Sequence, residues 1–162
     1  MDDDHKLDDG HFHVLLLNVL HSLSSNLKKL ISGTGPAGIG FTAIVVGGHV
    51  NVKRGSPIPF SKIINEYGYG FEIENGYFVC KKNGLYHFTA SVCTVTGDVW
   101  VRIYKNNVEV GYLYKDQDSK WGSGTGSIVV RMMRGDKLHL SAEKNIRIAD
   151  KVTIISGFCI SC

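Results

Sequence analysis

The chain has 162 residues, of which 43% are hydrophobic and 20% are charged, and it contains 19 glycines. This apolar share excludes a disordered chain, and the glycine content is far below the third that collagen requires. The formal net charge of +3 is spread too thinly to indicate a nucleic-acid-binding surface. The longest apolar run, Val14 to Leu17, is far shorter than the ~20 residues of a membrane-spanning helix. We expect a soluble globular domain with no nucleic-acid partner and no membrane span.

Residues 1–32 form the first predicted segment, an acidic start followed by a short amphipathic helix. Its leucines recur at spacings of four and three residues, which keeps them on one stripe: Leu16, Leu20, Leu23, Leu27 and Leu30. The stripe predicts either a short coiled coil or a helix lying on its own domain. The start lacks the positive region of a secretory signal. Residues 33–39, rich in glycine and containing a proline, predict a hinge.

Residues 40–162 predict an all-β domain without helices. Segments rich in Val, Ile, Tyr and Phe are separated by Gly, Asn and Asp turns, which is typical of an antiparallel sandwich or jelly roll. The expected strands are 41–46, a short one at 58–60, 76–80, 85–95, 98–104, 108–114, 127–133, 137–142 and 152–160. The sequence Arg134-Gly135-Asp136 predicts a hairpin turn between two of them.

The last strand predicts an outward apolar face. Val152 and Ile154 alternate with Thr153 and Ile155, so both sides of the strand carry apolar side chains. An outward apolar surface on a sandwich needs a partner that covers it. We expect neighbouring copies of the chain to provide that cover.

Aromatic residues of the body have the spacing of the globular head domain of complement C1q. The residues that carry this spacing are Phe60, Phe71, Phe78, Gly84, Tyr86 and Phe88. Glu66 and Ala90 depart from the pattern, which has Asn or Asp and an aromatic residue there. Over residues 39–162 the chain therefore resembles the C1q head family and its invertebrate lectin-like members. The resemblance implies a ten-stranded jelly roll of the C1q and tumour necrosis factor type, a homotrimer and secretion.

Two groups of side chains are candidates for ligand binding. In strand 98–104, alternation turns Val99, Val101 and Ile103 toward the core and three side chains outward: Trp100, Arg102 and Tyr104. The loop 114–126 adds Tyr114, Lys115, Asp116, Asp118 and Trp121. Aromatic rings stack on sugars while polar groups hydrogen-bond the hydroxyls. The alternatives are a stripe buried under a loop or under the N-terminal helix, and a loop that is only solvated.

The sequence contains no catalytic motif and no zinc-binding spacing, so we expect no enzyme. The resemblance implies a loop near the trimer apex, where some C1q-type heads hold calcium. Asp116 and Asp118 are then candidate ligands, with further oxygens needed from other loops or subunits. For the cysteines, free thiols are the first expectation and disulfide bonds the second, and the sequence leaves the pairing open. These residues are Cys80, Cys93, Cys159 and Cys162.

These expectations combine into a functional hypothesis. We predict a trimeric lectin-like protein that binds glycans or microbial polysaccharides in innate immunity, each head weakly and the trimer with avidity. The alternative is a receptor- or matrix-binding protein ligand, cytokine-like or synapse-organiser-like, without sugar specificity. Both remain open at this stage, because a jelly roll does not determine its ligand.

Overall fold

The computed structural model describes residues 17–25, 38–116 and 120–162. The chain divides into two units, Met1–Ala37 and Gly38–Cys162. In the first unit, residues 17–25 form a helix in which Leu20 and Leu23 are exposed. The other leucines of the predicted stripe lie outside the described residues, so the coiled coil stays a prediction. Among the described residues, no helix has the length and hydrophobicity needed to cross a membrane.

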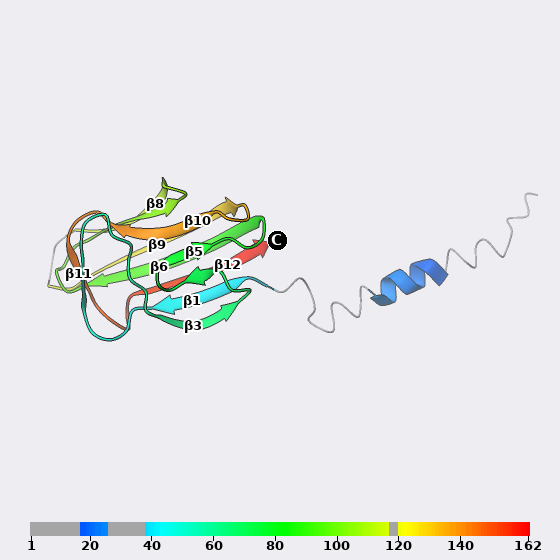
Figure 1. Ribbon diagram of the computed structural model, residues 1–162, viewed down its shortest axis with the longest axis horizontal. Coiled ribbons are helices and arrows are strands. Elements are labelled where there is room, and N and C mark those ends of the chain that lie inside the picture. Colours follow the sequence, from blue (N-terminus) through cyan, green and yellow to red (C-terminus); the bar gives the residue numbers. More distant parts are fainter. Residues whose placement is uncertain (1–16, 26–37, 117–119) are drawn as a thin grey trace, which may run out of the picture. The chain divides into compact units, whose positions relative to one another are not determined.

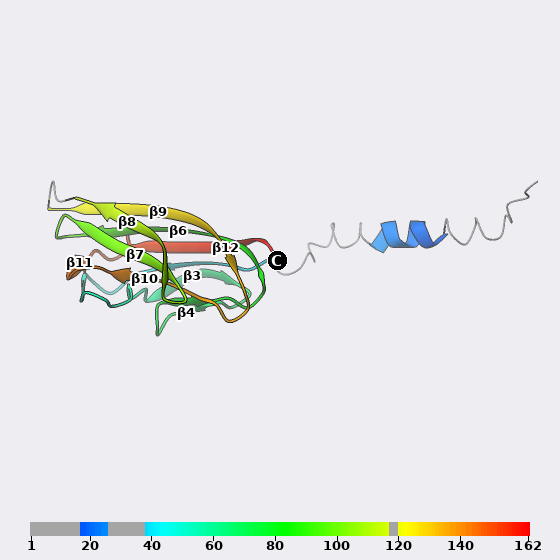
Figure 2. The same cartoon turned by 90° about the horizontal axis from the view of Figure 1, so that it is seen from above.

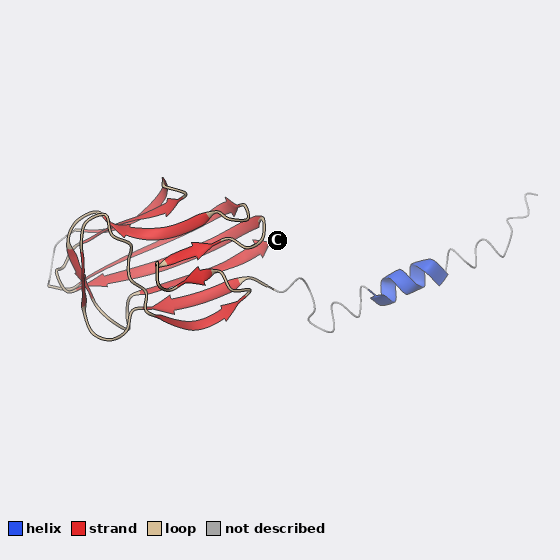
Figure 3. Ribbon diagram, viewed as in Figure 1, coloured by secondary structure: helices blue, strands red, loops and turns tan. Residues whose placement is uncertain are grey.

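The second unit is a sandwich of two antiparallel β-sheets, with no helix among its described residues (Figure 3). One sheet has the strand order β2-β11-β6-β12-β1-β3, and β9 also pairs with β6 (Figure 1). Its seven strands are β1 (Gly40–Ile44), β2 (Val50–Val52), β3 (Lys62–Tyr67), β6 (Gly84–Thr94), β9 (Gly122–Met132), β11 (Ile146–Ile148) and β12 (Ile154–Ser161). The five-stranded sheet follows the order β4 (Phe71–Glu72), β5 (Tyr77–Val79), β10 (Lys137–Ala142), β7 (Val99–Lys105) and β8 (Val108–Lys115).

An aromatic cluster joins the two sheets. Alternation along β6 buries Tyr86 and Phe88, as predicted from the sequence. Phe41 of the seven-stranded sheet stacks on Phe71 and Phe78 of the other sheet, with ring centroids 4.7 Å and 5.3 Å away. The hydroxyl of Tyr86 donates a hydrogen bond to the Lys82 carbonyl at 2.7 Å, and burial raises the pKa of this phenol. The aromatic residues that carry the family spacing therefore form the core.

Glu66, where the family pattern has Asn or Asp, holds the turn before β4. Its Oε1 accepts hydrogen bonds from the backbone N–H groups of Gly70 at 2.9 Å and Phe71 at 3.0 Å. These two donors would otherwise need other partners, because β4 begins at this point. The glutamate thus stabilises the entry of Phe71 into the core.

The all-β sandwich is confirmed, but its described residues form twelve strands rather than the ten expected. The strands absent from the prediction are β3, which has six residues, and β2, β4 and β11, which have only two or three residues each. Segments this short carry no measurable alternation. The predicted strand at 58–60 is wrong, since these residues form no strand and the isolated bridge beside them joins Pro57 to Ser141. Proline lacks the N–H group that a continuous ladder requires.

The turn at Arg134-Gly135-Asp136 is present, but it does not close a hairpin. β9 pairs with β6 in one sheet, whereas β10 pairs with β5 and β7 in the other. The turn therefore carries the chain from one layer of the sandwich to the other. Turn residues show that the chain reverses, but they do not show which strand becomes the partner.

Asp136→Ala is expected to lower the free energy of unfolding by about 2 kcal/mol near neutral pH, since its carboxylate holds the turn with several hydrogen bonds. It accepts from the Met133 N–H at 2.9 Å and the Asn106 amide at 2.7 Å, and pairs with Lys105 at 3.0 Å. The Met133 and Asn106 donors, aided by Lys105, lower its pKa from 3.8 to about 2.

Because the folded-state pKa lies below the unfolded one, this stabilisation is present above about pH 4 and is lost as the pH falls through about 2. Urea unfolding at neutral pH and near pH 2 measures the difference between wild type and variant at each pH. That difference should shrink on acidification. Glu74→Ala, at an exposed acid outside this turn, is the control and should change little. A difference that does not depend on pH would contradict the assignment.

Candidate functional site

The candidate site is built on the β7–β8 hairpin at one edge of the five-stranded sheet. Its two turn residues, Asn106 and Asn107, have positive φ values of 48° and 68°. Two-residue hairpin loops favour this backbone conformation, and asparagine tolerates it. The turn joins the two strands, and a register shift between Ile103 and Tyr104 gives the pairing in which Trp100 lies opposite Tyr114 and Arg102 lies opposite Tyr112.

Glycines of β9 allow this hairpin to pack closely on the other sheet. Gly122, Gly124 and Gly126 occupy alternate positions and share the inward face of the strand. A Cβ atom on Gly124 would lie 2.8 Å from Cγ1 of Val99, which is too close for any larger residue. β8 can therefore lie beside β9 (Figure 2). The strand β9 begins at Gly122, whereas the sequence predicts a start at residue 127. The prediction misses the first residues because glycine is not typical of strand interiors.

Alternation along β7 is as predicted. Val99, Val101 and Ile103 are buried, while Trp100 on the opposite face keeps 44% of its surface exposed. The described loops of the second unit therefore leave the Trp100 side chain partly exposed. Tyr112 and Tyr114 of β8 are exposed on the same outer face, beside Trp100 and Arg102.

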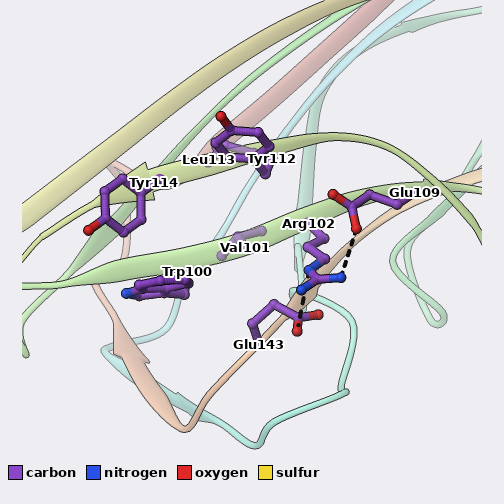
Figure 4. Close-up of a pocket in the computed structure, with 8 residues that line it drawn as sticks. All are labelled: Trp100, Val101, Arg102, Glu109, Tyr112, Leu113, Tyr114 and Glu143. Carbon is purple, nitrogen blue, oxygen red and sulfur yellow. Dashed lines mark hydrogen bonds and ion pairs between the residues drawn. The ribbon is translucent and has the colours of Figure 1, made fainter.

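A cavity of about 340 Å³ opens on this outer face. We call it the outer-face pocket, and its lining consists of Trp100, Val101, Arg102, Glu109, Tyr112, Leu113, Tyr114 and Glu143 (Figure 4). The rings of Trp100 and Tyr114 meet edge to face with centroids 4.7 Å apart. Cavities of this size with aromatic walls and a few polar groups are typical of small-molecule sites.

Two carboxylates hold the guanidinium of Arg102 at the polar end of the pocket (Figure 4). Nη1 donates to Glu109 Oε2 at 2.7 Å, and Nε lies 3.3 Å from Glu143 Oε2. Desolvation lowers the pKa of Arg102, but Glu109 and Glu143 outweigh it, so the net shift is upward. The hydroxyl of Tyr104 donates to Glu143 at 3.4 Å. Tyr104 is thus linked to the pocket through Glu143 rather than by lining it.

The segment after β10 supports the aromatic end of the pocket. The backbone N–H of Glu143 donates to the carbonyl of Trp100 at 2.8 Å. The ammonium group of Lys144 lies 5.8 Å from the Trp100 ring centroid and pairs with Asp98. The cation–π contact and the hydrogen bond to the backbone carbonyl therefore both help to orient the indole.

The predicted loop residues separate into different places. Tyr114 lines the outer-face pocket, whereas Trp121 packs edge-on against His49, with ring centroids 5.7 Å apart. His49 in turn pairs with Asp150 at 3.3 Å. Lys115 donates to the carbonyl of Asp116 at 2.9 Å. Trp121, Lys115 and Asp116 therefore lie outside the lining of the pocket.

The calcium hypothesis gains no support from the described side chains. Asp116 is described, but Asp118 lies outside the described residues. Within residues 17–25, 38–116 and 120–162, no group of three or more His, Cys, Asp or Glu side chains is arranged to hold a metal ion. We therefore assign no chemistry to calcium in the outer-face pocket.

Sequence reasoning did not find Glu109, Tyr112 or Glu143. The Asn106-Asn107 turn signals that their strand lies beside the strand of Arg102, but the register shift between Ile103 and Tyr104 that brings Tyr112 opposite Arg102 has no such signal. Glu143 had no comparable local signal. It reaches Arg102 only because β10 pairs with β7 in the five-stranded sheet.

The structure also resolves the state of the cysteines. A disulfide joins Cys159 and Cys162, whereas Cys80 and Cys93 are free, with Cys80 buried. The expectation of free thiols is therefore correct for one pair and wrong for the other. Cys162 follows the end of β12, and the chain there returns within bonding distance of Cys159.

The outer face of the seven-stranded sheet carries several exposed apolar side chains among serines and threonines. On β12, Ile155 is buried while Ile154 and Phe158 point outward and are exposed, which confirms the predicted outward apolar side of the last strand. The Phe158 ring packs beside His87 with centroids 5.2 Å apart. Further exposed apolar side chains of this sheet are Ile64, Val129 and Ile160. We call this surface the apolar face.

The sandwich is the fold shared by C1q heads and tumour necrosis factors. The globular domain of zebrafish complement 1qA protein matches it with a TM-score of 0.64 and 21% identity, over 75% of this chain and 97% of that chain. Eiger TNF from S. frugiperda matches with a TM-score of 0.66 and 10% identity, over 76% of this chain and 93% of that one. At these identities the likeness shows the fold.

The chain belongs to the C1q domain family, whose sequence pattern matches residues 40–160. The collagen alpha-1(X) chain of Mus musculus is 30% identical over 95 residues, which is 56% of this chain and 14% of that protein. Complement C1q and tumor necrosis factor-related protein 9B of Homo sapiens is 29% identical over 111 residues, 64% of this chain and 33% of that protein. The chain thus spans a third or less of these relatives. The family is non-enzymatic, its proteins typically trimerise, and its collagen-type relatives are secreted.

Proposed function

We propose that this chain is a secreted, trimeric recognition protein whose heads bind carbohydrate through the outer-face pocket. The observation that carries the proposal is the pairing of an aromatic wall with a hydrogen-bonding end. Trp100 and Tyr114 offer apolar ring faces, and Arg102 with its two glutamates offers donors and acceptors. A sugar ring presents complementary chemistry, since its C–H face stacks on aromatics and its hydroxyls both donate and accept.

The two faces of the sandwich support a division of roles. The apolar face on the seven-stranded sheet suits burial against neighbouring copies, because large exposed apolar surfaces favour association. The outer-face pocket belongs to the other sheet, so burial of the apolar face leaves it open. Three pockets on one assembly raise avidity for a repetitive ligand when the geometry allows simultaneous contact.

Binding of the full chain to an array of neutral, amino and acidic glycans and bacterial polysaccharides tests this proposal. We expect weak binding of single sugars in calorimetry and stronger retention on surfaces that display repeated sugars. The absence of binding to every saccharide tested, soluble or displayed, would overturn the proposal.

A protein partner is the second candidate. Trp, Tyr and Arg are enriched in the centres of protein–protein interfaces, and Trp100, Tyr112 and Arg102 lie together here. A receptor- or matrix-binding trimer would use the same surface but would bind one protein tightly. Saccharides would then fail to compete in a pull-down from host extract, whereas competition supports the carbohydrate proposal.

A further inference from the structure

We infer that the outer-face pocket selects a sugar ring without negative charge and rejects sugars that bear a carboxylate. The inference rests on the proposed carbohydrate function and names the class of sugar. It comes from how Arg102, the one cation among the described residues that line the pocket, is already engaged.

The guanidinium of Arg102 is engaged by protein carboxylates along two directions. Nη1 donates to Glu109 at 2.7 Å, and Nε lies 3.3 Å from Glu143 on the other side (Figure 4). The forked pairing by which arginine usually binds a ligand carboxylate requires donors that point the same way. Here protein acids hold donors at both ends of the group. A ligand carboxylate that binds in this forked way would have to displace one of them.

The charge balance of the lining opposes an anion as well. The lining has one guanidinium and two carboxylates, so it carries a net negative charge. Lys144 lies beside the pocket, but Asp98 neutralises it. A ligand carboxylate would be the third beside Glu109 and Glu143, and it would face like charges with no further cation among the described lining residues.

The same arrangement suits hydroxyl groups. Glu109 and Glu143 each retain acceptor capacity beyond their pairing with Arg102, and the guanidinium retains N–H donors. A sugar hydroxyl can donate to a glutamate and accept from the guanidinium, whereas a carboxylate can only accept. Trp100 and Tyr114 supply the stacking surface in either case.

Calorimetry with matched sugars tests the selectivity on the full chain. Glucose, glucosamine and glucuronic acid share one ring and differ in charge, and the galactose and mannose series repeat the comparison for other stereochemistries. In the best-binding series, we expect the uronic acid to bind at least about ten-fold more weakly than the neutral sugar. The amino sugar should bind at least as well as the neutral one.

The double variant Glu109→Gln with Glu143→Gln should reverse the preference. It keeps side-chain shape but removes both anions, which releases Arg102 to pair with a ligand carboxylate. We expect the uronic acid to bind this variant at least about ten-fold more tightly than it binds the wild type. Glu72→Gln with Glu74→Gln changes the net charge equally outside the pocket and should leave the preference unchanged. Thermal unfolding of both double variants checks that they fold.

The outcomes separate the two proposals. If sugars bind and Trp100→Ala removes the binding, but uronic acids bind the wild type as well as neutral sugars do, then the inference about charge fails alone. A folded Glu109→Gln, Glu143→Gln variant that gains no affinity for uronic acids also overturns it. If no sugar of any charge binds the wild type, the carbohydrate function and the inference fail together.

Discussion

Phe158→Asp is expected to convert the assembled protein into single chains. Phe158 keeps 51% of its surface exposed on the apolar face, next to His87. In an assembly that buries this face, each copy would bring one carboxylate out of water and into an apolar interface. Burying an unpaired charge is far more unfavourable than burying a phenyl ring is favourable. A threefold assembly would suffer this penalty in every copy, so dissociation should be nearly complete.

Sedimentation velocity measures this directly, with a wild-type particle expected at three times the 17.8 kDa chain mass. Val108→Asp is the matched control, because Val108 is also apolar and 65% exposed but lies on the β7–β8 hairpin of the other sheet. This variant should remain assembled. Circular dichroism of both variants checks that the sandwich is intact. A wild-type protein that sediments as single chains at micromolar concentration would contradict the proposed trimer.

Trp100→Ala is expected to weaken saccharide binding by roughly thirty-fold, or about 2 kcal/mol, as for an aromatic residue at the centre of a binding site. The substitution removes the larger ring of the aromatic wall and the partner of Tyr114. Stability should change much less, since Trp100 points outward and the neighbouring Val99 and Val101 form the core. Calorimetry with the best sugar from the array measures the affinity.

Trp121→Ala is the matched comparison for this experiment. Trp121 is 57% exposed and packs against His49, outside the lining of the outer-face pocket. We expect this variant to bind like the wild type. The opposite result, with binding lost in Trp121→Ala and kept in Trp100→Ala, would move the site from the pocket to the loop that contains Trp121.

The features that the sequence predicts correctly are local ones. Alternation places Val99 and Val101 in the core and Trp100 outside, and it buries Tyr86 and Phe88 from β6. The period of two along a strand is a property of its own backbone and survives whichever strand pairs with it. Other predictions are incorrect because they depend on which strands pair. The turn at Arg134-Gly135-Asp136 is present, yet it joins two sheets instead of closing a hairpin.

By itself, the sequence determines the all-β class, the aromatic core, the outward apolar side of the last strand and one wall of the candidate site. The tertiary structure decides the rest of the site. Glu143 contacts Arg102 because β10 lies beside β7. Tyr114, which is predicted together with the loop residues, lies beside Trp100 because of the pairing in the hairpin. Alternation along a single strand decides which of its side chains lie in the core and which lie on the surface. A pocket instead requires side chains from separate strands to converge, and only long-range pairing brings those strands together.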